Sequence, residues 1–350
     1  MMSIIKPHIM AMSAYKPPLD GRNPKAYTLL DFNERTIPVS DVIVAALNNY
    51  IADGRLQQYP AYGDIVQRLA DYAGVKPEQL MITNGSDQGI DLVFRAVAKA
   101  GAEAIIPGPS FAMYTQCAKV EAMQLVEPLY TKEGGYPVQQ VLDAINANTA
   151  IIVISNPNNP CGTIVSEKDI EIIAKAAPQA AILVDECYYE YSRETSVGLL
   201  SNLPNLFITR TFSKTWGIPS LRFAYLMASP ESVQALCNVR GPYDINQLAV
   251  VAAEAALDNP EYTECYVKEV MGEAKPLLEQ WLDQNNIGYW PSSANYVWVF
   301  PNNAEAVSQG LNEKGFLVRP KEYEGSLGLR ITVGTLEQTQ KLIIALSQLV

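Results

Sequence analysis

The first two thirds of the chain alternate short apolar runs with segments of helical periodicity. Most of the apolar runs show no alternation of polar and apolar residues, which is typical of strands buried on both faces beneath helices. The predicted strands are Leu80 to Thr83, Glu103 to Pro107, Ala150 to Ser155, Ala180 to Asp185, Leu206 to Arg210 and Arg222 to Met227. The amphipathic segments between them include Asp64 to Tyr72, Ser86 to Ala100 and Ser166 to Ala176. This alternation predicts an α/β fold with a mostly parallel central sheet.

The pattern changes after about residue 257. A long helical stretch, Glu261 to Gln284, is predicted with an interruption at Pro276. Shorter strands and helices then follow: Asn295 to Phe300, Ala304 to Lys314, Phe316 to Arg319, Leu327 to Val333 and Leu336 to Leu349. A chain of 350 residues is long enough for two domains. We therefore expect a large α/β domain over residues 41–257, and a smaller α+β domain formed by residues 258–350 together with the proline-rich N-terminal segment, residues 1–40.

Composition narrows the classes of function. The net charge of -11 argues against a duplex nucleic-acid partner, which would require a clustered basic surface. The single histidine, His8, excludes a histidine-rich metal cluster, so no metal is predicted, and we expect its side chain to be solvated. Five cysteines without a C-x-x-C pair favour a reducing compartment. No apolar run suits a secretory signal or a membrane span. These features predict a cytoplasmic protein without a membrane partner.

The segment around Lys214 carries the clearest chemistry. Lys214 follows a predicted strand, with Thr211 and Ser213 just before it and Arg222 eight residues after it. A lysine amine can form an imine with an aldehyde cofactor, and hydroxyls with a guanidinium can hold a phosphate. A Ser-Lys pair alone is common on protein surfaces, so its significance depends on the segments that accompany it.

Asp185 ends another buried run and is followed by Tyr188. Ligands of open α/β sheets bind at the carboxyl ends of strands, and pyridoxal phosphate (PLP) chemistry requires a carboxylate beside the pyridine nitrogen. Asp185 is equally suited to cap the following turn. Tyr188 is suited to a hydrogen bond with the cofactor's phenolic oxygen or, alternatively, to packing at a domain edge.

Three further loops follow predicted strands. The segment Ser155 to Gly162 contains two prolines, so it forms a shaped turn that can direct the Asn159 amide into the same crevice. Gly85 and Ser86 precede a long helix, whose N-terminus is a natural phosphate site, although capping alone also explains Ser86. Tyr114 can stack on a planar ring or pack in the core. The glycines match neither G-x-G-x-x-G nor a Walker A loop, which disfavours nicotinamide and ATP.

Taken together, these segments resemble the fold-type I PLP-dependent aminotransferases of class I/II, and within them the histidinol-phosphate aminotransferase branch. The resemblance extends from about Tyr15 to the end of the chain. It is carried by Gln58-Tyr-Pro60, Asn84-Gly-Ser-Asp87, Asn158-Asn-Pro160, Val184-Asp-Glu186, Thr211-Phe-Ser-Lys214, Leu221-Arg222 and Gly328-Leu-Arg-Ile-Thr-Val-Gly-Thr335. Each motif is short, but their shared order argues against coincidence.

The resemblance implies a role for each matching residue. Lys214 would be the Schiff-base lysine and the acid-base group that moves the substrate proton, while Asp185 would bind the pyridine nitrogen. Asn159 and Tyr188 would contact the ring oxygen, and Tyr114 would stack on the ring face. The other expected cofactor contacts are Tyr59, Gly85, Ser86, Asp87, Thr211, Ser213 and Arg222.

The implied substrate site is formed around two arginines. Arg330 and Arg319 would bind a substrate phosphate, since a pair of guanidinium groups suits a dianion. The other expected substrate contacts are Tyr15, Asn33 and Asn159. The alternative for Arg319 is a surface ion pair with Glu322 or Glu324.

The resemblance implies transamination between a small-molecule amino donor and a 2-oxo acid acceptor. In this branch, histidinol phosphate and 2-oxoglutarate give imidazole acetol phosphate and glutamate. A homodimer is implied as well, because Tyr59 would reach the partner's cofactor phosphate.

Three departures from the branch leave alternatives open. Asn33-Glu-Arg-Thr36 stands where the branch usually has Asn-Glu-Asn-Pro, Cys161 replaces a threonine, and Pro219-Ser220 replaces Ala-Gly. The first borders the substrate pocket. An aromatic amino-acid aminotransferase and a lyase of the threonine-phosphate decarboxylase type therefore remain alternatives. A catalytically silent binding domain is disfavoured because the lysine, aspartate and arginine of the chemistry are all present.

Overall fold

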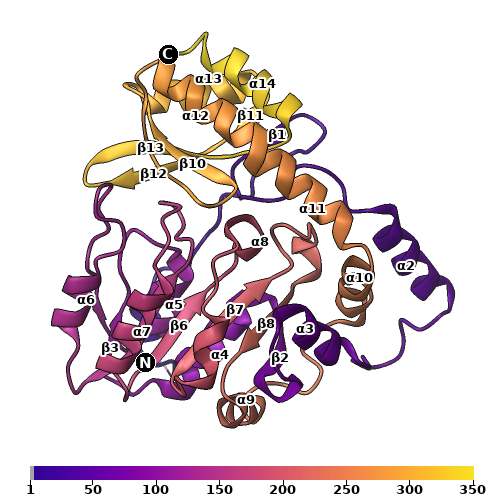
Figure 1. Ribbon diagram of the computed structural model, residues 1–350, viewed down its shortest axis with the longest axis vertical. Coiled ribbons are helices and arrows are strands. Elements are labelled where there is room, and N and C mark those ends of the chain that lie inside the picture. The colour runs from indigo at the N-terminus through magenta and orange to yellow at the C-terminus, as the bar shows by residue number, and fades with distance from the viewer. Residues whose placement is uncertain (1–3) are drawn as a thin grey trace.

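The computed structural model describes residues 4–350, and within that range its largest sheet has seven strands in the order β2-β8-β7-β6-β5-β3-β4 (Figure 1). β8 is antiparallel to β2 and β7, while the other neighbours pair in parallel. The strands are β2 (Leu80–Asn84), β3 (Glu103–Ile105), β4 (Gln124–Val126), β5 (Thr149–Ser155), β6 (Ala181–Asp185), β7 (Leu206–Thr211) and β8 (Phe223–Met227). The predicted mostly parallel α/β sheet is confirmed, and β4 is an additional edge strand.

Both faces of this sheet are buried. Along β5, Ile151 and Val153 belong to one hydrophobic cluster, whereas Ile152 and Ile154 belong to another on the opposite face. The first face is covered by α4 (Gly85–Val97), α5 (Ala112–Val120) and α9 (Pro230–Cys237). The second is covered by α3 (Ile65–Ala73), α6 (Val138–Ala144), α7 (Glu167–Ala176) and α10 (Gln247–Leu257). Burial on both faces explains why these strands are uniformly apolar.

A four-stranded antiparallel sheet in the order β12-β13-β10-β9 lies at the top of Figure 1. Its strands are β9 (Gly288–Trp290), β10 (Tyr296–Phe300), β12 (Arg319–Tyr323) and β13 (Ser326–Thr332). One face packs through Val297 and Leu329 against α12 (Lys275–Gln284), α13 (Ala304–Glu313) and α14 (Leu336–Leu346). The other face includes Trp290 and Trp298, which join the core of the large sheet. We propose that the large domain spans residues 41–257 and that residues 258–350 form the small domain together with residues 1–40.

The long helix leading into this sheet is continuous. It runs through α11 (Pro260–Glu269), the π-helical turn η4 (Val270–Ala274) and α12, and Pro276 lies in the first turn of α12. The predicted interruption at Pro276 is therefore a local change of hydrogen-bond register instead of a break, because the wider π-turn accommodates a residue that lacks an N–H.

The N-terminal segment wraps around the molecule. After α1 (Pro7–Ala11), its short strand β1 (Thr28–Leu29) pairs with β11 (Phe316–Leu317), and the chain then passes between the two larger sheets before α2 (Asp41–Ala52). His8 is half-buried, with Nε2 3.1 Å from the carbonyl of Val120, so the expectation of a solvated histidine is wrong. From residue 4 onward, no helix combines the length and apolarity needed to cross a membrane.

Candidate active site

Lys214 lies just beyond the carboxyl end of β7. Its Nζ donates a hydrogen bond to the backbone carbonyl of Phe32 at 2.8 Å and lies 5.8 Å from the ring centroid of Tyr188. Burial, together with the positive charge of Arg330, lowers the pKa of Lys214 to about 8. About a tenth of this amine is therefore neutral and nucleophilic at pH 7, far more than for a lysine with an ordinary pKa.

Asp185 ends β6, the strand next to β7. Its side chain is 4% exposed, and it accepts hydrogen bonds from the Tyr114 hydroxyl at 2.5 Å, the Thr209 hydroxyl at 3.0 Å and the Cys187 N–H at 3.2 Å. Burial raises the pKa of the carboxyl group, while the three donors favour the charged form. The Cys187 contact is a local turn cap, so one oxygen serves the turn while the other is held by Tyr114.

Tyr188 and Asn33 meet at the boundary between the two sheets. The Asn33 amide donates to the Tyr188 hydroxyl at 2.9 Å, and its carbonyl oxygen accepts from the Thr332 hydroxyl at 3.1 Å. Asn33 is fully buried and has a φ of 56°, a conformation that asparagine tolerates better than most residues. Tyr188 is thereby fixed near Lys214, with its hydroxyl bound to the N-terminal segment.

The start of α4 is a candidate phosphate cradle, at which three segments meet. β8 pairs with both β2 and β7, which brings the start of α4 beside Thr211, Ser213 and Arg222. Arg222 Nη2 pairs with Asp87 at 2.8 Å. Gly85 starts α4 with a φ of 72°, and a Cβ at this position would collide with the Arg222 guanidinium. The N–H groups of the first turn, from Gly85, Ser86 and Asp87, and this arginine suit a dianionic phosphate.

Arg330 connects the small sheet to this region. Its Nη1 donates to Asn159 Oδ1 at 2.5 Å and its Nη2 donates to the backbone carbonyl of Asp31. Arg319 lies directly opposite Arg330 on β12, and its guanidinium carbon is 5.6 Å from the Phe32 ring centroid. In the described chain no ion pair joins Arg319 to an acidic residue, so the alternative of a surface ion pair is not supported.

The ring of Tyr114 does not fit the stacking role expected of it. The side chain has no exposed surface, and its hydroxyl is bound to Asp185. The Phe111 ring contacts Tyr114 edge to face, with centroids 5.7 Å apart, and is only half-buried. Phe111, at the N-cap of α5, is therefore the better candidate to stack on a planar ligand, and Tyr114 orients Asp185.

Two predicted residues lie outside this cluster. Tyr59 is 78% exposed and packs against the ring of Tyr243 with centroids 4.6 Å apart. Tyr15 is 40% exposed, and among the described residues it forms no hydrogen bond or ring contact with the cluster. A single copy of the chain therefore brings neither residue to Lys214.

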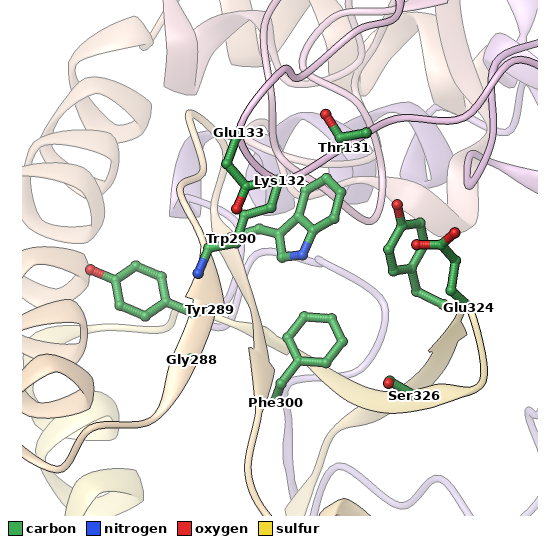
Figure 2. A pocket seen from close by; sticks show the side chains of 10 residues that line it. Thr131, Lys132, Glu133, Gly288, Tyr289, Trp290, Phe300, Glu324 and Ser326 are labelled. Atoms are coloured by element: carbon green, nitrogen blue, oxygen red, sulfur yellow. The ribbon is translucent and has the colours of Figure 1, made fainter.

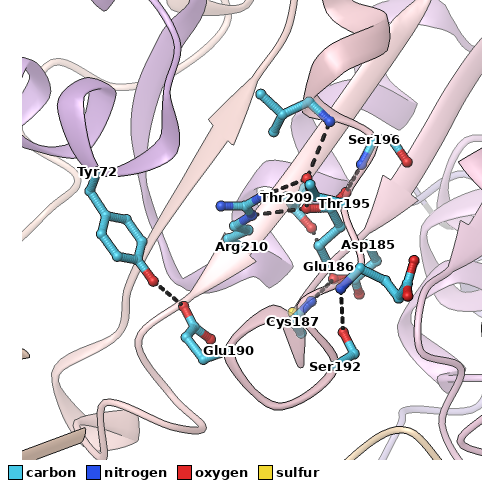
Figure 3. Close-up of polar contacts among 12 residues, drawn as sticks. Tyr72, Asp185, Glu186, Cys187, Glu190, Ser192, Thr195, Ser196, Thr209 and Arg210 are labelled. Atoms are coloured by element: carbon cyan, nitrogen blue, oxygen red, sulfur yellow. Dashed lines mark hydrogen bonds and ion pairs between the residues drawn. The ribbon is translucent and has the colours of Figure 1, made fainter. Parts of the chain in front are cut away.

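A buried ionic network lies behind Asp185 (Figure 3). Glu186 has no exposed surface and pairs with Arg210 Nε at 2.9 Å. Glu190 accepts hydrogen bonds from Trp216 at 3.0 Å and from Thr215 at 3.2 Å. The network joins β6 and β7 to the turn that follows Lys214, so it fixes the backbone on which the cluster is placed.

Sequence reasoning did not identify the backbone carbonyls of Asp31 and Phe32, because a carbonyl carries no residue-specific signal. It also passed over Cys187, whose thiol lies 3.3 Å from the Ser86 hydroxyl. A separate pocket of about 400 Å³ lies between the small sheet and the hairpin around Lys132, with the rings of Trp290 and Phe300 at its wall (Figure 2). This pocket contains none of the predicted site residues.

Comparisons with known proteins identify the family. Residues 26–346 match the family model described as aminotransferase class I and II. The chain is 34% identical over 331 residues to a histidinol-phosphate aminotransferase from Brevibacillus brevis, covering 91% of this chain and 89% of that relative. It is 31% identical over 361 residues to histidinol-phosphate aminotransferase 2 from Bacillus cereus, covering 98% and 95%.

Two solved structures show the same fold. The histidinol-phosphate aminotransferase from Sinorhizobium meliloti, in complex with pyridoxal-5'-phosphate, superposes with a TM-score of 0.89 at 22% identity, covering 100% of this chain and 98% of that one. The L-threonine-O-3-phosphate decarboxylase from Porphyromonas gingivalis gives a TM-score of 0.78 at 21% identity, covering 92% and 98%.

Proposed function

The chain belongs to the class I and II aminotransferase family and is a PLP-dependent transaminase, and we propose that its substrate is histidinol phosphate, with 2-oxoglutarate as the amino acceptor. The observation that carries the substrate proposal is the juxtaposition of Arg319 and Arg330 on one sheet face near Lys214, where neither guanidinium forms an ion pair with any carboxylate of residues 4–350. Paired guanidinium groups suit a phosphate monoester dianion better than the single carboxylate of a free aromatic amino acid.

The bound cofactor would supply an electrophilic aldehyde and an electron-withdrawing ring. Lys214 would hold the aldehyde carbon and then, as a free amine, move the proton at the substrate Cα. A pKa of about 8 suits this task, because the amine can both accept and return a proton near neutral pH. Asp185 would hold the proton of the ring nitrogen.

The remaining residues would bind and orient. Asn159 and Tyr188 would contact the ring oxygen, and their own partners, Arg330 and Asn33, fix their side chains in advance. Phe111 would cover one ring face. The phosphate would be held by the start of α4 together with Thr211, Ser213 and Arg222.

The proposal includes a cytoplasmic homodimer in which Tyr59 reaches the cofactor phosphate of the partner subunit. The exposure of Tyr59 in the single chain supports this part of the proposal. Tyr243 packs against it, and α2 and the segment after it carry further exposed apolar side chains, namely Val42, Val44, Ile51 and Leu56. Such a group of apolar residues is typical of a protein interface.

A lyase acting on a phosphorylated amino acid is the second candidate, because the two arginines would favour its substrate equally. The test is a panel of histidinol phosphate, phenylalanine, tyrosine and threonine phosphate, scored for keto product and for carbon dioxide. We expect keto product from histidinol phosphate with 2-oxoglutarate as acceptor. Carbon dioxide from threonine phosphate would support the lyase, and efficient turnover of free phenylalanine with inert histidinol phosphate would refute the proposed substrate.

The cofactor attachment is tested separately. Borohydride reduction of the yellow holoenzyme, followed by peptide mass analysis, is expected to label Lys214. The variant Lys214→Ala should remain unlabelled and inactive, and turnover by this variant would refute the assignment.

A further inference from the structure

The third cation of the small sheet, Lys321, was not among the expected substrate contacts. Along β12, Arg319, Lys321 and Tyr323 are half-buried, while the residues between them are exposed. Because side chains alternate between the faces of a strand, these three share one face. The register with β13 places Arg319 opposite Arg330 and Lys321 opposite Gly328. Lys321 therefore lies on the sheet face that carries both arginines.

On this face Lys321 lies beside aromatic rings as well as the two arginines. A Cβ at Gly328 would lie 2.6 Å from Trp298 Nε1, so aromatic rings of β10 close the floor beside Lys321. Burial, then the charges of Arg330 and Arg319, lower the pKa of Lys321 to about 8. A lysine solvated on an open surface would experience none of these effects. Charges that face an apolar wall also interact more strongly than charges in water.

Nearby acidic residues do not neutralise this group of cations. Asp31 and Glu34, on the N-terminal segment, are both bound by Arg22, at 3.0 and 2.5 Å. The guanidinium of Arg22 covers the same Phe32 ring that Arg319 approaches. Over the described residues, no carboxylate forms an ion pair with Arg319, Lys321 or Arg330. The sheet face therefore carries three cations, Arg319, Lys321 and Arg330, while the two carboxylates of the adjoining N-terminal segment are held by Arg22.

We infer that Lys321 is a specificity-determining residue of the substrate-anion site, where it acts with Arg319 and Arg330 to select a dianionic phosphate group. This inference deepens the proposed function and rests on it. Three cations on a partly buried face are better balanced by a phosphate monoester dianion than by a monoanionic carboxylate, which would compensate only one of their charges. Lys321 would supply charge to the site without taking part in proton transfer at Cα.

The test compares Lys321→Met and Lys321→Arg with a matched control, Lys132→Met. Lys132 is an exposed lysine on the hairpin beside the same sheet, outside the machinery described above. Holoenzymes are compared for KM and kcat with histidinol phosphate, and for inhibition by inorganic phosphate and by acetate. Circular dichroism and the cofactor absorption band establish that each variant is folded and loaded.

Lys321→Met is expected to raise KM and the phosphate inhibition constant about tenfold, on the scale of losing one charge-assisted contact, with kcat changed less than about twofold. Acetate inhibition should change less than about threefold. Lys321→Arg should stay close to the parent enzyme, because it keeps the charge, and Lys132→Met should be unchanged.

The inference would be overturned if the phosphate inhibition constant and the KM of Lys321→Met stayed within twofold of the parent values. It would also be overturned if Lys132→Met weakened phosphate inhibition as much as Lys321→Met does, or if Lys321→Met weakened acetate inhibition as much as phosphate inhibition. Two further outcomes separate a failure of this inference from a failure of the proposed function. If histidinol phosphate is inert while Lys321→Met still selectively weakens phosphate inhibition of whichever substrate of the panel reacts, the substrate proposal fails and the dianion site stands. If histidinol phosphate reacts and Lys321→Met behaves like the parent, the role of Lys321 alone is refuted.

Discussion

Replacing Arg210 with methionine should destabilise the fold more than any change to a surface charge of this protein. Arg210 is 1% exposed, donates from Nε to Glu186 at 2.9 Å and from Nη2 to Thr195 at 2.6 Å, and lies 3.4 Å above the Tyr189 ring. Methionine retains most of the apolar volume but removes the charge. Glu186, which has no exposed surface, is then left without its cation.

The magnitude follows from the burial of Glu186. Removing one partner of a buried ion pair costs about 3–5 kcal/mol, because the remaining charge is desolvated and uncompensated. Hydrogen bonds from Ser196 N–H at 2.6 Å and the Thr195 hydroxyl at 3.0 Å remain, so we expect the lower half of that range. The exposed pair Lys175–Glu171 provides the control, and Lys175→Met should cost less than about 0.5 kcal/mol.

The loss of stability should also depend on pH. Burial raises the pKa of Glu186, and Arg210 opposes that rise, so its removal raises the pKa further. A folded-state pKa above the unfolded value means that stability is fully present at low pH and is lost as pH rises through the folded pKa. The deficit of Arg210→Met should therefore be largest near pH 7.5 and smaller near pH 5.5.

Urea unfolding of parent and variants at both pH values measures these differences. Adding Glu186→Gln to Arg210→Met should recover part of the loss, since the buried charge is then gone. A deficit below about 1 kcal/mol at pH 7.5 would show that the pair is not a significant source of stability. A deficit that does not change with pH would refute the assignment of the penalty to a charged Glu186.

Three further predictions concern the site. Tyr114→Phe removes a hydrogen bond to the Asp185 carboxylate and should weaken PLP binding by about 1.5–3 kcal/mol, measured by fluorescence titration; unchanged affinity would refute the positioning role. The rate at which the apoenzyme captures PLP should rise with pH through about 8, because the neutral amine of Lys214 attacks the aldehyde, and a flat profile from pH 6.5 to 9.5 would contradict this. Phosphate inhibition of the holoenzyme should weaken as pH rises through about 8, because Lys321 then loses its proton. The variant Lys321→Arg should retain phosphate inhibition to higher pH. If the pH profiles of phosphate inhibition were parallel in the two enzymes, titration of Lys321 would be excluded.

The large sheet was predictable because its strands are buried on both faces and so carry uniform apolar runs. The predicted ends of β6 and β7 therefore place Asp185 at the end of one strand and Lys214 shortly after the end of another, and in the structure these two strands are neighbours. β4 was missed because it is a three-residue edge strand whose residues are partly exposed, which leaves no clear pattern. The cofactor side of the site could thus be predicted from the positions along the chain at which the strands end.

The substrate side was harder to predict because it depends on tertiary contacts. The partners of Lys214 and Arg330 on the N-terminal segment are the backbone carbonyls of Phe32 and Asp31, which any residue would supply. The stacking prediction for Tyr114 failed for a similar reason. The motif contains two aromatic residues, Phe111 and Tyr114, and the sequence does not show which ring has an open face.

The N-terminal segment explains how a departure from the expected pattern is tolerated. Arg35 donates to the carbonyl of Thr215, the residue after Lys214, and its guanidinium lies 4.4 Å from the Tyr262 ring centroid on α11. The Thr36 N–H donates to the Tyr266 hydroxyl at 3.1 Å, a bond that a proline at this position would lack. Both changed residues therefore have partners that hold the segment against α11 and the turn after Lys214. The segment still presents its carbonyls to Lys214 and Arg330, so the departure alters how the segment is anchored and leaves its contacts with the reacting groups in place.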